Sequence, residues 1–336
     1  MRVYLHGKDL AGWSVDADRR HTERFLKDLG HTITGSIFSS DIVHSVYWSQ
    51  LLFKRDFLLR FKKNIFAVAT NMIEPDKNLD YQKAKKLVSL WVAPSKIQLG
   101  RLKSDGVNVA YQPFYVDETV FRRLDIAKEK IAGALGIDYE AIRDKALIGS
   151  FQRDTLGSDL KTPKWQKGPE LLIEILESLP KRGQWVLVLA GPRRHFVISE
   201  CEKKGIPYIY AGIKPMPGVD DISKNILNHD RMSLLYNLVD CYLMTSKSEG
   251  GPKAVLEASF CKTMIFSTGV GLAPDILDSR CIYHDIDEIV ASLSAFIAKQ
   301  DGSMEIVAAN FNNVNSVCSY EAMKNRWKEI YETYAG

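Results

Sequence analysis

The sequence lacks the features that mark secreted, membrane-spanning and nucleic-acid-binding proteins. Its five cysteines form no C-x-x-C pair, which excludes the common zinc and redox motifs and favours reduced thiols in a cytoplasmic protein. No apolar run approaches the roughly 18–20 residues of a membrane-spanning helix. The chain opens directly on an apolar strand within Met1 to His6, so we expect no signal peptide. The formal net charge of +4 requires no nucleic-acid partner.

The sequence also lacks the residue spacings of a metal site. None of the seven histidines stands at the spacing of a metal site. The sequence has two Asp-x-Asp pairs, Asp16/Asp18 and Asp285/Asp287, a pattern that elsewhere holds a metal–diphosphate. Both pairs are predicted to lie at the start of a helix, where aspartate is favoured as a cap. We therefore predict no metal site.

The fold class is indicated by short apolar runs that alternate with amphipathic stretches, which is typical of βα units around parallel sheets. A length of 336 residues, of which 46% are hydrophobic and 26% charged, suits two domains with sizeable cores. We predict two Rossmann-like doubly wound domains at residues 1–130 and 145–316, joined by the charged, helical residues 124–144. The last helix, within residues 320–336, has an apolar face, and packing on its own domain is the plain interpretation.

These patterns predict ten strands and a series of helices between and after them. The strands are Val3–His6, Ile42–Tyr47, Ile65–Thr70, Leu90–Ala93, Val109–Gln112, Ala146–Phe151, Trp185–Ala190, Tyr208–Ala211, Asp240–Thr245 and Met264–Ser267. The helices are Asp18–Leu29, Pro169–Leu179, His195–Lys204, Arg231–Val239, one beginning at Pro252, Ile286–Lys299 and Tyr320–Tyr334.

The most informative segment is the run SEGGPKAVLEA at residues 248–258. A helix is predicted to begin at Pro252, because proline suits the first helical position. Gly250 and Gly251 leave the backbone bare just before that helix. The backbone N–H groups and the positive end of the helix dipole favour an anion or sugar hydroxyls there. We therefore predict that Gly250, Gly251, Pro252 and Lys253 contact a bound ligand.

Two carboxylates flank this turn. Glu249 stands on the loop, and Glu257 lies inside the helix between Leu256 and Ala258, where a core-packing helix needs no charge. One carboxylate at the mouth of a site and one lower down can accept hydrogen bonds from two polyols at once. A sugar nucleotide offers two such groups, the transferred sugar and the ribose.

Seven residues separate Glu249 from Glu257, and the segment resembles the glutamate–seven–glutamate motif of retaining glycosyltransferases of family 4. That family has the GT-B fold, in which two Rossmann-like domains face each other across a cleft. The resemblance implies that the last helix, residues 320–336, packs back onto the first domain. The resemblance implies that Glu249 lies beside the donor sugar and that Glu257 holds the ribose hydroxyls of a UDP- or GDP-sugar. The alternative is a strand–turn–helix unit with solvated glutamates.

Arg153 and Lys167 form a second pair, and the resemblance places them on the diphosphate. Breaking a sugar–diphosphate bond builds negative charge on the leaving phosphate, which fixed cations stabilise when no metal is present. Thirteen residues lie between them, more than the family usually has. Lys161 and Lys164 therefore remain alternatives to Lys167, and a pair of solvated loop cations is the plain interpretation.

The resemblance also implies three weaker assignments. Gly12 stands where the family has a glycine-rich loop facing the donor phosphates. Backbone groups of Gly212 and Ile213, after the strand at Tyr208–Ala211, are expected to contact the nucleotide base. Asn71 stands where family members often have a histidine facing the donor sugar, and it can donate a hydrogen bond but cannot act as a base.

Residues 51–63 contain five cations, one acid and many apolar side chains. We favour the helix of a βα unit with its apolar face in the core. The alternative is a basic amphipathic helix that rests on the inner face of an anionic membrane.

The sequence thus predicts a metal-independent, retaining, hexosyltransferase-like glycosyltransferase of glycan biosynthesis. Its donor is a nucleoside-diphosphate sugar, and its acceptor is an alcohol on a glycan, a lipid-linked glycan or a small molecule. Two alternatives remain. One is a non-catalytic nucleotide-sugar-binding protein, suggested by the missing histidine, and the other is a GT-B sugar phosphorylase.

Overall fold

The computed structural model describes residues 1–9, 14–298 and 303–335. Two predicted positions, Gly12 and the helix end at Lys299, lie outside the described residues. The chain divides into two units. The first comprises Met1–Tyr115, Glu249–Lys253 and Ser316–Gly336, and the second comprises Val116–Ser248 and Ala254–Asn315.

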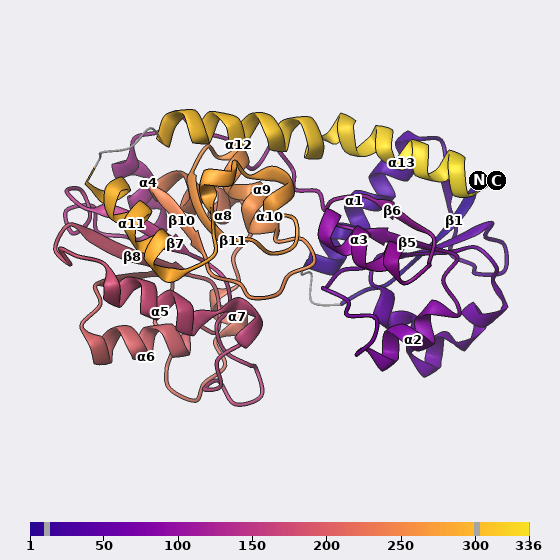
Figure 1. Ribbon diagram of the computed structural model, residues 1–336, viewed down its shortest axis with the longest axis horizontal. Helices are drawn as coiled ribbons and strands as arrows, with labels where there is room; N and C mark the ends of the chain where they lie inside the picture. The colour runs from indigo at the N-terminus through magenta and orange to yellow at the C-terminus, as the bar shows by residue number, and fades with distance from the viewer. Residues whose placement is uncertain (10–13, 299–302, 336) are drawn as a thin grey trace. The chain divides into compact units, whose positions relative to one another are not determined.

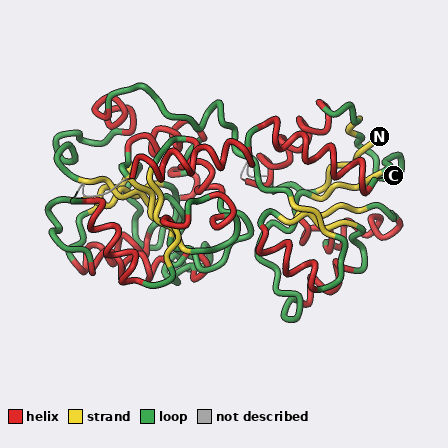
Figure 2. The backbone as a smooth tube through the Cα atoms, turned by 45° about the horizontal axis from the view of Figure 1, so that its top comes forward, coloured by secondary structure: helices red, strands yellow, loops and turns green. Residues whose placement is uncertain are grey.

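The first unit is built on a parallel six-stranded sheet (Figure 1). In spatial order its strands are β2 (Thr32–Ile33), β1 (Arg2–His6), β3 (Ile42–Ser45), β4 (Ile65–Val68), β5 (Leu90–Ala93) and β6 (Val109–Tyr111). Its helices are α1 (Ser14–Asp28), α2 (Leu79–Lys85), α3 (Lys96–Ser104) and α13 (Tyr320–Tyr334). Figure 2 shows the strands as a layer with helices on both faces, the arrangement that buries a parallel sheet.

Helix α13 belongs to the first unit, although it lies at the end of the chain. Its side chains Met323, Trp327 and Tyr331 are buried in one core cluster with Val3, Leu5 and Phe25 of β1 and α1. The Tyr331 hydroxyl lies 2.8 Å from Nδ1 of His44 on β3. The apolar face read from the sequence therefore packs on the first sheet.

The second unit has its own parallel six-stranded sheet. In spatial order the strands are β12 (Ile282–Tyr283), β11 (Met264–Thr268), β10 (Cys241–Met244), β7 (Ala146–Ser150), β8 (Trp185–Ala190) and β9 (Tyr208–Ala211). The helices are α4 (Lys128–Leu135), α5 (Pro169–Ser178), α6 (His195–Lys204), α7 (Ile222–Asn225), α8 (His229–Leu238), α9 (Lys253–Phe260), α10 (Ala273–Ile276), α11 (Ile286–Ile297) and α12 (Ser303–Cys318).

The chain order of the second sheet is that of the doubly wound Rossmann fold. Strands β8 and β9 are added on one side of β7, and β10, β11 and β12 on the other. The direction of winding therefore reverses between β7 and β10. Ligands of open α/β sheets bind at the carboxyl ends of the strands at such a reversal.

The predicted fold class is confirmed, and the differences are local. The edge strands β2 and β12 were not predicted, because two-residue strands carry no periodic pattern. The helix favoured for residues 51–63 is wrong: two 3-10 helices, Trp48–Leu52 and Lys54–Phe61, occupy this region. Asp56 has non-helical backbone angles, and its carboxylate lies 3.2 Å from Nε2 of buried His6.

Candidate functional site

Arg153, Lys167 and Glu257 of the candidate site belong to the second unit, where β7 and β10 end side by side. Ile148 and Gly149 of β7 pair with Cys241 and Tyr242 of β10. The loop after β7 carries Arg153. The loop after β10 leads directly to the SEGGPKAVLEA segment, and the strand–turn–helix arrangement predicted there is present.

Three loops are tied together at this edge by hydrogen bonds. The side-chain amide of Gln152, after β7, donates to the carbonyl oxygen of Lys167 at 2.9 Å and accepts from the Ser246 hydroxyl at 3.1 Å. The Thr245 hydroxyl also donates to the Lys167 carbonyl, at 3.3 Å. The backbone N–H of Lys247 donates to the carbonyl oxygen of Gln166 at 2.8 Å. The backbone that carries Lys167 is thus held beside the loop that leads to Glu249.

Gly168 is required by this arrangement. It is in the left-handed region, with φ of 58°, and it precedes helix α5, whose first residue is Pro169. A Cβ atom at this position would lie 2.0 Å from the carbonyl oxygen of Thr245, which no real structure tolerates. The close approach between the Lys167 loop and β10 therefore depends on glycine.

Gly168→Ala is expected to destabilise the second unit, because the left-handed conformation alone costs about 1–2 kcal/mol in an alanine and the clash adds to it. A loss of about 2 kcal/mol corresponds to a fall of roughly 4–8 °C in the midpoint of thermal unfolding of a unit this size. The matched control is Gly183→Ala, because nothing lies within 4 Å of a Cβ there. Equal midpoints for the two variants would show that the loop does not need glycine.

The extra residues between Arg153 and Lys167 fold back on themselves. Thr155 and Pro163 form an antiparallel bridge, and the N–H of Lys164 donates to the carbonyl oxygen of Asp154 at 2.7 Å. The extra residues therefore form a hairpin that begins at Asp154 and ends at Lys164, just before the turn that carries Lys167. This hairpin accounts for the unusual spacing in the sequence.

Arg153 has a cationic neighbour that the sequence reading missed. Burial lowers the pKa of Arg153, and the charge of Arg193 lowers it further. The carbonyl oxygen of Arg193 accepts a hydrogen bond from the N–H of Asp154 at 3.1 Å, and its guanidinium is paired with Asp220 at 2.7 Å. Arg193 also has a φ of 59°, which is uncommon for a residue with a side chain. The sequence feature that could have indicated this cation is the Gly-Pro-Arg-Arg run, residues 191–194, directly after β8.

A buried ion pair stabilises the loop after β7. Nε of Arg194 lies 3.2 Å from the Asp154 carboxylate, and both side chains are almost fully buried. Burial raises the pKa of Asp154 to about 7, against the opposing charge of Arg194. The carboxylate also accepts from the backbone N–H groups of Phe196 and Val197 at 3.2 and 3.4 Å. These contacts fix the residue that follows Arg153.

Glu257 lies in the middle of α9 and is partly exposed. Its Oε2 accepts a hydrogen bond of 2.9 Å from the hydroxyl of buried Tyr236 on α8. Burial, and then the charge of Glu257, raise the pKa of Tyr236 well above its usual value. The hydroxyl therefore stays a donor at neutral pH and orients the carboxylate.

Glu249 is partly exposed, and the next four residues are tightly packed within the first unit. A Cβ on Gly250 would lie 2.6 Å from the carbonyl oxygen of Thr70, and one on Gly251 would lie 2.6 Å from the Phe114 ring. The ammonium of Lys253 lies 2.5 Å from the Asp18 carboxylate. Helix α9 begins at Lys253, so Pro252 stands immediately before it. Both glycines are thus required by close packing, whichever ligand binds.

Asn71 is exposed and has a fixed orientation. Its Oδ1 accepts a hydrogen bond of 2.8 Å from the indole N–H of Trp48. Because an indole nitrogen only donates, the amide oxygen must face Trp48 and the amide nitrogen is the group that can donate elsewhere. The donor role expected for Asn71 fits this orientation.

The backbone groups of Gly212 and Ile213 make contacts that the sequence did not predict. The N–H of Gly212 donates to the carbonyl oxygen of Tyr210 at 3.1 Å. The N–H of Ile213 donates to Oδ1 of Asn225 at 2.9 Å, and the carbonyl oxygen of Ile213 accepts from Nδ2 of Asn225 at 2.8 Å. These groups are therefore engaged within the protein.

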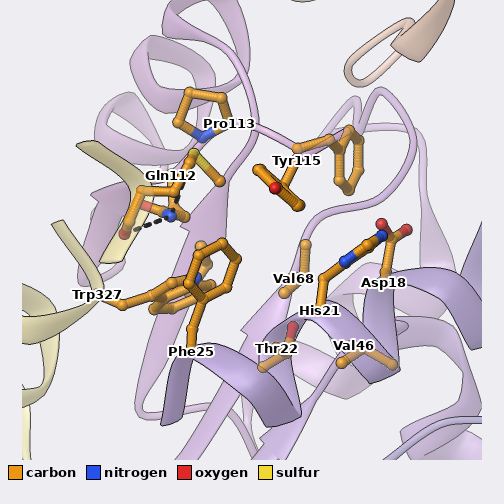
Figure 3. Close-up of a pocket in the computed structure, with 13 residues that line it drawn as sticks. Asp18, His21, Thr22, Phe25, Val46, Val68, Gln112, Pro113, Tyr115 and Trp327 are labelled. Atoms are coloured by element: carbon orange, nitrogen blue, oxygen red, sulfur yellow. Dashed lines mark hydrogen bonds between the residues drawn. The ribbon is translucent and has the colours of Figure 1, made fainter. Parts of the chain in front are cut away.

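A small cavity lies within the first unit (Figure 3). Asp18, His21 and Thr22 of α1 line it together with Tyr115 and Trp327. The His21 and Tyr115 rings meet edge to face, with centroids 4.8 Å apart. The volume open to a water-sized probe is only about 30 Å³.

Solved structures of known proteins share this architecture over almost the whole chain. HepE from Anabaena, in complex with UDP, is 12% identical over 99% of this chain and 99% of that chain, with a TM-score of 0.73. A glycosyltransferase from Rickettsia africae is 14% identical over 99% and 98%, with a TM-score of 0.71. A UDP-forming trehalose-phosphate synthase from Burkholderia xenovorans is 12% identical over 95% and 78%, with a TM-score of 0.65. No protein-family model and no curated protein sequence matches the chain.

The chain has the GT-B fold. Within the described residues of this GT-B chain, no group of three or more histidine, cysteine, aspartate or glutamate side chains is placed to hold a metal ion. The two Asp-x-Asp pairs lie at helix starts, and Asp285 caps α11 by accepting from the N–H of Glu288 at 2.8 Å. All five cysteines are buried, and none forms a disulfide.

The GT-B chain has no helix among its described residues that is both long and apolar enough to span a bilayer. In the segment 51–63, the rings of Phe53, Phe57 and Phe61 are 47%, 54% and 75% exposed, and Lys54 and Arg60 are exposed with them. These side chains are compatible with peripheral contact to an anionic membrane, which stays a prediction.

Proposed function

We propose that this GT-B chain is a retaining glycosyltransferase that resembles family 4. It would transfer a sugar from a UDP- or GDP-sugar to an alcohol acceptor without a metal ion. The observation that carries the proposal is the position of the SEGGPKAVLEA segment. It begins at the carboxyl end of β10, where the sheet reverses, beside the loops of Arg153 and Lys167.

In this proposal Arg153 and Lys167 bind the diphosphate. The bond between the anomeric carbon and the diphosphate oxygen breaks, and its electron pair leaves with the nucleotide. Fixed cations favour this step because they stabilise charge that is larger in the transition state than in the bound donor. Arg193 stands beside Arg153 and adds positive charge at the same edge.

Glu249 accepts hydrogen bonds from hydroxyls of the transferred sugar, and its negative charge favours the positive charge that develops at the anomeric carbon. The acceptor oxygen then bonds to that carbon on the face the nucleotide leaves, so configuration is retained. The acceptor proton passes to the departing diphosphate oxygen. Asn71 donates an orienting hydrogen bond, and no protein base is needed.

Glu257→Ala is expected to weaken binding of bare UDP or GDP, because its proposed partner is the ribose. A lost charge-assisted hydrogen bond costs about 1.5–3 kcal/mol, which is about 10- to 150-fold in affinity. Isothermal titration calorimetry measures the effect directly. Tyr236→Phe is the matched control, since it removes only the hydrogen bond that orients the carboxylate. Its effect should be smaller, and an unchanged affinity in Glu257→Ala would contradict the ribose assignment.

A non-catalytic nucleotide-sugar-binding protein is the second candidate, because Asn71 stands where related enzymes often have a histidine. The two candidates differ in one respect. An enzyme consumes the donor slowly by hydrolysis even without an acceptor, whereas a binding protein returns it unchanged.

A further inference from the structure

In the loop that follows β9, side-chain contacts limit which backbone groups can bind the base of the donor nucleotide. The family resemblance assigns base contacts to backbone groups of Gly212 and Ile213. In the structure the Asn225 side chain engages both the N–H and the carbonyl of Ile213. An amide presents a donor and an acceptor side by side, as does the hydrogen-bonding edge of a nucleobase. Asn225 therefore uses the only N–H of Ile213 and one of the two lone pairs of its carbonyl oxygen, so a base edge cannot make the paired donor–acceptor contact there.

This contact is part of a buried network. Asn225 is only 2% exposed, and its Nδ2 also donates to Oδ2 of Asp221 at 2.7 Å. Asp221 is 4% exposed, and its Oδ1 accepts from the N–H of Arg193 at 2.9 Å. Releasing Asn225 would break several hydrogen bonds and leave buried polar groups unsatisfied, which is unfavourable. The network therefore keeps Asn225 on Ile213.

Gly212 adds to the closure of this loop. Its N–H is used by Tyr210, and a Cβ at this position would lie 2.7 Å from Oδ1 of Asn225. In contrast to these engaged backbone groups, the side chain of Ile213 is apolar and 61% exposed. At the end of β9 the protein thus offers a base a hydrocarbon surface in place of the Ile213 backbone edge.

We propose that the donor base is recognised by its face, packed on the side chain of Ile213, and not by its hydrogen-bonding edge. This inference rests on the proposed function. Packing against the face of a base does not depend on the base's donor and acceptor pattern, because every base has such a face. Reading an edge with paired hydrogen bonds discriminates strongly between bases, and packing on a face discriminates less. The chain should therefore accept several nucleobases.

The test is calorimetry of the full chain with UDP, GDP, ADP, TDP and inorganic diphosphate. The affinities of the four nucleotides should lie within about tenfold of one another. Ile213→Ala should weaken all four by a similar factor of about three to ten and leave inorganic diphosphate unchanged. Ile126→Ala is the matched control, because Ile126 is also an exposed isoleucine but lies outside this loop.

Asn225→Ala supplies a second test, because it releases the backbone groups of Ile213. The freed N–H and carbonyl of Ile213 can then bind a base edge, so the ratios of the four affinities should change in this variant, and ratios do not depend on how much of the protein is folded. A spread wider than tenfold in the natural chain, or unchanged ratios in Asn225→Ala, would overturn face recognition alone. Failure of all four nucleotides to bind would overturn the proposed function as well.

Discussion

Replacing Glu249 with alanine is expected to lower turnover about 100- to 1000-fold, the usual effect of removing one preorganised group that stabilises transition-state charge. The affinity for bare UDP or GDP should change little, because Glu249 is proposed to contact the transferred sugar and not the nucleotide. The contrast with Glu257→Ala is the informative part: one glutamate should affect turnover, and the other should affect nucleotide binding.

The measurement for Glu249→Ala combines donor hydrolysis with calorimetry on the same protein preparation. Glu174→Ala is a suitable control, since Glu174 is an exposed carboxylate on α5 outside the proposed site. If Glu249→Ala were fully active while Asn71→Ala abolished turnover, the assignment of the two groups would be reversed. A modest decrease is expected for Asn71→Ala, because it provides only an orienting hydrogen bond.

Arg153→Ala is expected to lower kcat/KM by about 100-fold or more, since it removes a fixed charge from the leaving diphosphate. Part of the loss should appear as weaker diphosphate binding, and part as slower turnover, because charge on the leaving group grows in the transition state. Arg153→Lys should recover only some activity, since lysine is a point charge and does not bridge two phosphate oxygens.

The control for Arg153 is Lys130→Ala, an exposed cation on α4. Parallel substitution of Lys161, Lys164 and Lys167 identifies the second cation, and the largest loss is expected at Lys167, which follows the hairpin. Wild-type activity in Arg153→Ala would remove this residue from the leaving-group site and leave Arg193 as the cation at that edge.

The fold was predictable where the pattern is periodic and buried. Strand β8 and helix α6 were predicted at the residues where they occur, because six consecutive buried apolar residues and a capped amphipathic run give clear signals. Strands β2 and β12 were not predicted, since two residues carry no period. The prediction for the region 51–63 was wrong in type: Asp56 has non-helical backbone angles and lies 3.2 Å from His6, a residue far away in the sequence.

The candidate site was predictable where the residues are close in sequence. Glu249, Glu257 and the glycines form one segment, so their spacing is visible in the sequence. The neighbours of the site residues are not visible, because only the fold brings Tyr236 to Glu257, Arg193 to Arg153 and Asn225 to Ile213. Asn225 in particular lies in a short helix, and nothing in its sequence surroundings indicates a contact with Ile213.

The central claim, a metal-independent glycosyltransferase, is tested most directly by donor hydrolysis in EDTA. The purified chain is incubated with UDP- and GDP-sugars, and the released nucleoside diphosphate is measured, with Glu249→Ala in parallel. We expect release that is unaffected by EDTA and lost in the variant. A strict requirement for manganese or magnesium would contradict the role of Arg153 and Lys167, and donors bound but returned intact would show a binding protein.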